Sequence, residues 1–219
     1  DSISKNAPPE VVKRIVALDA LGRYIAGFDQ TDSTSYTKLQ KETSWKNYKA
    51  STDSSWNLLF EERLGKMKSW QSSNLATKIN DSLSVFYPFS GPDFLHAYYL
   101  YPSANEFILV ALEPIMDAVK LDTLNSSTRN SFLDSLNHSL RDSFRKSFFE
   151  TNNMREDIKR VKGVLPLLDF FIERSGHELV GQQYFYLDSA GSETPVSIAK
   201  LYKYRTPGVK LEFRDRQTR

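Results

Sequence analysis

Residues 85–114 read VFYPFSGPDFLHAYYLYPSANEFILVALEP, and this stretch decides the fold. Residues 85–87 are a short run of β-branched and aromatic residues, and residues 107–112 are a continuous apolar run too short for an independent helix. Both patterns predict strands. Between them, Pro92 can occupy the first turn of a helix that ends before Pro102. A strand, a short helix and a strand in this order favour a right-handed parallel crossover.

The crossover gathers polar side chains at one edge of the two strands. Ser90, Gly91 and Asp93 follow the first strand, Glu113 ends the second, and His96 lies one helical turn further on. Ligands of parallel sheets bind in the crevice at the carboxyl ends of the strands. Helix amides there would bind an anion, and Asp93 with Glu113 would act as an acid/base pair if their environments separated their proton affinities.

The same residues also have a purely structural interpretation. Ser90 or Gly91 would cap the helix, and Asp93 would interact with its dipole. Glu113 would only end its strand before a proline. We do not expect a triad of Ser90, His96 and Asp93, because the nucleophile motif G-x-S-x-G is missing. The catalytic and the structural interpretations both stay open.

The N-terminal third has helical periodicity. Pro8 and Pro9 lie where a helix can begin, and apolar residues then recur at near-helical spacing up to Gly27. Residues 36–49 predict a weaker helix. The clearest amphipathic helix comes next, and its apolar stripe consists of Trp56, Leu59, Phe60, Leu64, Met67 and Trp70.

The second half predicts two helices, at residues 127–149 and 165–175. Three strands are expected after them, at residues 178–187, 196–205 and 209–214, with a tight turn before the last strand in which Gly208 takes a positive φ. The predicted class is therefore α+β. A helical N-terminal third packs on a mixed sheet that has a short β-α-β crossover and a C-terminal antiparallel meander.

Composition excludes several classes of protein. Hydrophobic residues make up 40% and charged residues 26%, which is typical of a folded globular chain and not of a disordered or fibrous one. Lys and Arg number 29 against 27 Asp and Glu, and the resulting net charge of +2 is too small to wrap nucleic acid or to steer the chain to anionic lipid. No stretch reaches the roughly 18 apolar residues of a membrane span.

No cofactor or metal is expected. Cysteine is absent, which excludes disulfides, thiol catalysis and Cys-ligated zinc. His96, His138 and His177 are scattered and fit no metal-binding motif, and neither a P-loop nor a G-x-G-x-x-G motif is present.

The beginning of the chain suggests export. It starts at Asp1 without an initiator Met, and we interpret residues 1–9 as a flexible lead of a single α+β domain that comprises residues 1–219. A boundary near residues 72–81 is the alternative. A signal peptide or a lipid-anchored cysteine upstream of Asp1 would explain this start, and a cloned fragment would explain it equally.

One block has a family resemblance. Residues 87–95, YPFSGPDFL, followed by Tyr101-Pro102 and by residues 107–114, FILVALEP, resemble an uncharacterised family of exported or lipid-anchored bacterial envelope proteins. The resemblance implies a periplasmic or outer-membrane-anchored location. It implies no activity and no catalytic residue.

Two hypotheses for function follow. The first is a non-catalytic binding or scaffolding module of the cell envelope, with an unknown envelope ligand or protein as its partner. The second is an acid/base hydrolase centred on Ser90, Asp93, His96 and Glu113. Nucleic acid is a third and distant candidate, because the C-terminal stretch mixes basic residues such as Lys200, Lys203 and Arg205 with Tyr202 and Tyr204.

Overall fold

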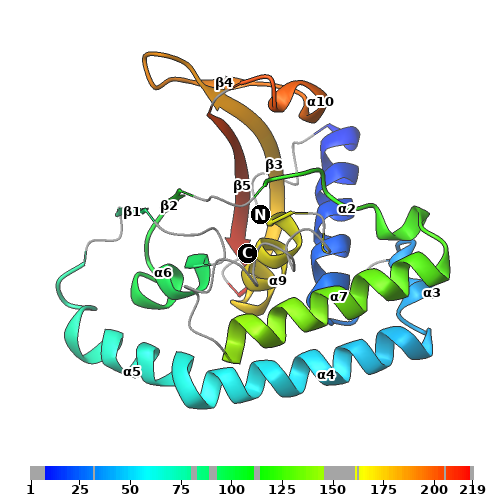
Figure 1. Ribbon diagram of the computed structural model, residues 1–219. Helices are drawn as coiled ribbons and strands as arrows, with labels where there is room; N and C mark the ends of the chain where they lie inside the picture. The colour runs from blue at the N-terminus through cyan, green and yellow to red at the C-terminus, as the bar shows by residue number, and fades with distance from the viewer. Residues whose placement is uncertain are drawn as a thin grey trace.

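The computed structural model describes residues 8–31, 33–79, 83–88, 93–110, 114–145, 161, 163–204 and 206–217 (Figure 1). Helices α2 (Pro9–Ile25), α3 (Tyr36–Leu39) and α4 (Thr43–Leu59) form the N-terminal part. Helix α4 continues through a π-helix (Phe60–Leu64) into α5 (Gly65–Asn74), so that one long rod lies along one side of the molecule (Figure 1). The helical N-terminal part is thus confirmed.

The π-helix corrects the predicted apolar stripe of this rod. Leu59 and Leu64 are both buried although they are five positions apart, where an α-helix would repeat its buried face after three or four. Gln71 is buried while Trp70 is 52% exposed. A π turn holds one more residue than an α turn, so the buried face moves by one residue along the sequence. Phe60 and Trp70 were therefore wrongly predicted to share the buried face.

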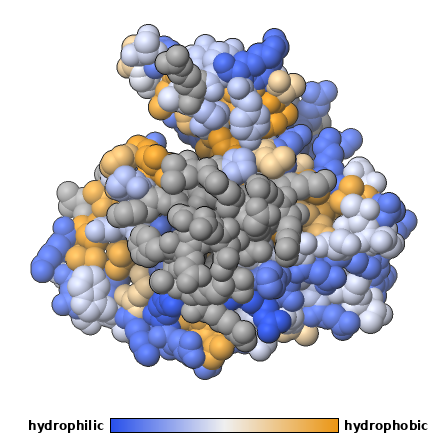
Figure 2. Space-filling model, in the orientation of Figure 1, coloured by the Kyte–Doolittle hydropathy of each residue, from blue (hydrophilic) through white to orange (hydrophobic). Residues whose placement is uncertain are grey.

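The predicted parallel crossover is present. Strands β1 (Ser84–Tyr87) and β2 (Glu106–Leu109) pair in parallel and are joined through α6 (Phe94–Leu100). Apolar side chains reach the surface over this pair (Figure 2). Phe86, which is 64% exposed, lies beside Ile108, which is 46% exposed, in the strand register.

The C-terminal strands form a second, antiparallel sheet. It contains β3 (His177–Leu187), β4 (Glu193–Pro195) and β5 (Pro207–Asp215) in the order β4-β3-β5. Strands β3 and β5 are long and curved, and they extend beyond the helices toward β4 and α10 (Ile198–Leu201) (Figure 1). The α+β class and the antiparallel C-terminal strands are thus confirmed. The strands form two separate sheets in place of the expected mixed sheet, and β3 is the central strand where a meander would have β4.

Two local predictions in this sheet were wrong. Residues 196–205 were expected to be a strand. The strand in this part of the chain is the short β4, which ends at Pro195, and α10 follows it. Gly208 lies within β5 and does not have a positive φ. Glycine is needed there for space, because a Cβ at this position would lie 2.3 Å from the ring of Phe185 on β3.

Two further helices close the core. Helix α7 (Ser126–Arg145) packs on α4, and the largely buried α9 (Leu165–Arg174) lies between the helices and the long strands (Figure 1). A short 3₁₀-helix (Leu121–Thr123) precedes α7. Within the described ranges, no helix combines the length and the apolar character that a membrane span needs.

A buried ionic network joins the end of β5 to the core. The guanidinium of Arg216 contacts the carboxylates of Asp19 on α2, Glu173 on α9 and Glu178 on β3. Glu178 also pairs with Arg214. All three carboxylate residues are buried, so Arg216 holds three separate elements against the last strand.

Candidate functional site

The carboxyl end of β1 carries part of the predicted site. Asp93 precedes α6 and is buried, and its Oδ1 lies 3.6 Å from Nδ1 of His96. Burial raises the pKa of Tyr87, and the nearby Asp93 and Tyr101 raise it further. The structure thus brings Asp93, His96 and Tyr87 together. Ser90, Gly91 and Glu113 lie outside the described residues, so their part in the acid/base site stays a prediction.

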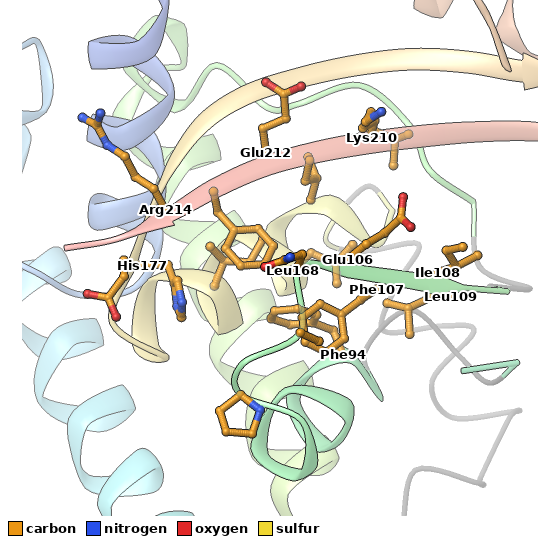
Figure 3. A pocket seen from close by; sticks show the side chains of 18 of the residues that line it. Phe94, Glu106, Phe107, Ile108, Leu109, Leu168, His177, Lys210, Glu212 and Arg214 are labelled. Atoms are coloured by element: carbon orange, nitrogen blue, oxygen red, sulfur yellow. The ribbon is translucent and has the colours of Figure 1, made fainter. Parts of the chain in front are cut away.

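A hollow lies elsewhere, between β2 and β5. We name it the β2–β5 cleft, and its volume is about 610 Å³, within the usual range for ligand sites. Neither Asp93 nor His96 is among the residues that form it. Its lining consists of residues 102–109, residues 209–215 and Phe94, Leu168, Ile172, His177, Phe185 and Glu193 (Figure 3).

The floor of the β2–β5 cleft is apolar and rigidly packed. Phe94 of α6 has its ring centroid 5.3 Å from that of Phe107 on β2 and 5.7 Å from that of Phe213 on β5. Leu168 and Ile172 of the buried helix α9 complete the floor, and both are buried. The floor therefore ties the two sheets together through side chains.

The walls of the cleft are strand edges. In the described part of the chain, β2 pairs only with β1, and β5 pairs only with β3. The unpaired edges of β2 and β5 face each other across the cleft (Figure 3). Such edges present main-chain N–H and C=O groups that can bind another extended segment.

Charged residues stand on the rim. Lys210, Glu212 and Arg214 lie along β5 on the side away from Phe94, and Glu106 points from β2 into the space between the strands (Figure 3). Both cations are already paired, Lys210 with Glu193 at 3.7 Å and Arg214 with Glu178.

The described rim is more acidic than basic, with the carboxylates of Glu106, Glu193, Glu212 and Asp215 against the two cations Lys210 and Arg214. Since both cations already have a carboxylate partner, the excess charge of the rim is negative.

A buried imidazole closes one end of the cleft. His177 packs edge-on against the rings of Tyr98 and Phe213, with centroid distances of 5.0 and 5.1 Å. Burial lowers its pKa, although the nearby Asp215 raises it. Burial therefore favours the neutral form of the ring.

A second hollow, of about 510 Å³, lies between α4 and α7. It is lined by serines of α4, by Leu59 and Phe144 and by the charged residues Glu62, Arg63 and Arg141. It offers no strand edge. Among the described residues, no group of three or more His, Asp or Glu side chains is arranged to hold a metal ion.

The sequence indicates which face of β5 points inward, but it does not indicate that β5 lies beside β2. Residues 209–214 alternate between apolar and charged residues, which predicts that Val209, Leu211 and Phe213 point inward and that Lys210, Glu212 and Arg214 point outward. The three apolar side chains are half-buried and Lys210 and Glu212 are exposed, as predicted, whereas Arg214 is half-buried. Nothing in the sequence indicates that the edge of β5 faces β2, because about a hundred residues separate the two strands and side chains, not main-chain pairing, connect them.

Comparison with protein-family models, with curated proteins and with solved structures finds no match to this chain. The function is therefore inferred from the geometry of the site.

Proposed function

We propose that the chain is a non-catalytic binding module of the bacterial cell envelope and that the β2–β5 cleft holds a segment of polypeptide. The observation that supports this most is the pair of unpaired strand edges on either side of an apolar floor. Main-chain edges supply affinity for an extended peptide, and the pockets beside them select its side chains.

The placement of ionisable groups supports a binding role over a catalytic one. The charged residues that line the cleft stand on its rim, and the floor beneath them is formed by aromatic and aliphatic side chains. Catalytic pairs need their reacting groups within hydrogen-bond reach of the bound substrate. Asp93 and His96, which do contact each other, are not part of the lining.

Selection from a library of random twelve-residue peptides tests this function. Ala104 lines the cleft, and in Ala104→Trp an indole would occupy part of its volume. We expect the wild-type chain to enrich specific peptides and Ala104→Trp to enrich them at least about tenfold less. The matched control is Ala76→Trp, because Ala76 is exposed and lies outside the cleft. Equal enrichment by Ala104→Trp and wild type would contradict the proposal.

The envelope location is supported by the resemblance of the block at residues 87–95. Its test is fractionation of cells that express the protein from its native gene. We expect the protein in the periplasmic or outer-membrane fraction. Recovery of the protein in the cytosolic fraction alone would contradict this location.

An acid/base hydrolase is the second candidate, because Asp93 and His96 lie 3.6 Å apart at the carboxyl end of β1. It predicts hydrolysis of p-nitrophenyl esters or phosphates that both Asp93→Asn and His96→Asn reduce by at least about a hundredfold. His138→Asn is the matched control, because His138 is exposed on α7. Activity that is equal in all of these variants would exclude the site.

A further inference from the structure

The two sheets each have an unpaired strand edge at the β2–β5 cleft in the described part of the chain. In the described part of the chain, the sheet order is β1-β2 on one side of the cleft and β5-β3-β4 on the other, with the unpaired edges of β2 and β5 between them. The residue order in Figure 3 shows that β2, from Glu106 to Leu109, and β5, from Lys210 to Arg214, run in opposite directions. A strand between them would be parallel to one and antiparallel to the other.

We propose that the ligand binds by strand addition: an extended segment with alternating apolar and basic residues pairs antiparallel with β5 and joins the two sheets into one. This inference rests on the proposed function. Strand β5 is the longer template, with nine residues against four in β2, and antiparallel pairing is slightly more stable per residue. An added strand in this direction runs parallel to β2.

The chemistry of the segment follows from the two sides of the cleft. Successive side chains of a strand point to opposite faces, so every second side chain would point to the floor of Phe94 and Leu168. Those positions favour aliphatic residues. The others would point to the rim, where Glu106 accepts a hydrogen bond from Ser84 at 2.9 Å and neither Glu106 nor Glu212 has an ion-pair partner in the described part of the chain.

The charge of the rim also decides between classes of ligand. Unpaired carboxylates attract a cationic side chain and repel a phosphate backbone. Lysine and arginine at alternate positions of the segment would therefore gain affinity, and nucleic acid would lose it. An acidic peptide would meet like charges on both walls.

The probe is a seven-residue peptide of alternating Lys and Val, which in an extended form spans about 20 Å. We expect it to bind at least about tenfold more tightly than the matched Glu and Val peptide. Binding should slow hydrogen exchange of every second β5 amide at residues 209–215, the amides that point away from β3, because new main-chain hydrogen bonds form at that edge. N-methylation of alternate residues of the probe should weaken binding, because it removes those donors.

Charge reversal provides the matched variants. Glu106→Lys should weaken the Lys and Val probe about tenfold and strengthen the Glu and Val probe, whereas Glu61→Lys, on an exposed residue outside the cleft, should change neither. Binding of both probes with equal affinity, or binding without protection of β5, would overturn strand addition while leaving a peptide-binding cleft intact. If the library selection yields peptides that Ala104→Trp binds equally well, it is the proposed function that fails.

Discussion

Nη2 of Arg216 lies 2.6 Å from Oε2 of Glu173 in the core, and burial nevertheless favours the protonated form of Glu173. Burial raises the pKa of Glu173 to about 8, and the neighbouring Asp19 raises it further, against the lowering effect of Arg216. A protonated Glu173 still has an oxygen that accepts a hydrogen bond from Arg216, and the same guanidinium also contacts Asp19 and Glu178.

This protonation makes stability depend on pH. The pKa of Glu173 is raised above its ordinary value of 4.5, so its favourable contribution is complete below pH 4.5 and is lost as the pH rises to about 8. We expect Glu173→Gln to reduce this loss, because glutamine stays neutral while keeping an oxygen for Arg216. Urea unfolding at pH 5 and pH 9 measures the effect, and the exposed Glu62→Gln is the control. A variant as pH-dependent as wild type would contradict the assignment.

Asp169 provides a second and independent pH effect. Burial alone raises its pKa from 3.8 to about 7, and its Oδ1 has no hydrogen-bond partner among the described residues. The free energy of unfolding therefore decreases as the pH rises from about 4 to about 7, because ionised Asp169 is less favourable in the folded chain than in the unfolded one. A pKa shift of this size corresponds to a decrease of roughly 4 kcal/mol. We therefore expect Asp169→Asn to be more stable than wild type at pH 9 and close to it at pH 3. Thermal unfolding at both values checks this, and a variant that is less stable at pH 9 would show that the carboxylate has a partner.

Removal of Arg216 should be among the most damaging changes in the sheet. Arg216→Leu would leave the buried carboxylates of Asp19 and Glu178 without their shared cation. We expect the free energy of unfolding at pH 7 to fall by about 3–5 kcal/mol. The matched control is Lys210→Ala, since Lys210 and Glu193 are both about half exposed and such pairs contribute about 1 kcal/mol or less. Similar losses in the two variants would contradict the network's role.

Substitutions at Gly163 and Gly191 distinguish two costs of adding a side chain: backbone strain at positive φ, and the clash of the added Cβ with its neighbours. Both have positive φ, +99° and +81°, but a Cβ on Gly163 would lie 2.6 Å from the carbonyl oxygen of Ile115, whereas a Cβ on Gly191 would meet nothing within 4 Å. We expect Gly191→Ala to cost about 1–2 kcal/mol from backbone strain alone, and Gly163→Ala to cost more because main chain must move. Denaturant unfolding of both variants tests this, and equal costs would mean that the contact at Gly163 relaxes freely.

Local pattern predicted much of the fold and little of the cleft. The parallel crossover at residues 85–114 and the inward face of β5 were predicted correctly, because period and turn residues act within one element. Gly208 was interpreted as a turn residue, whereas the ring of Phe185 decides its role from another strand. The β2–β5 cleft depends on Phe94 contacting both Phe107 and Phe213, and such long-range packing has no local signal.

The π-helix at Phe60–Leu64 predicts how the sequences of related proteins differ in this segment. A homologue that lacks one residue of this segment would continue as an ordinary α-helix, and its residue aligned with Gln71 would still point inward. Eleven steps of about 100° after Leu59 make the same three turns that twelve steps make through the wider π turn. Insertions and deletions normally accumulate in loops, but here a one-residue gap within a helix would leave the pattern of buried residues after it intact. Sequence alignments of relatives should therefore show such a gap without an exchange of the residues at positions 70 and 71.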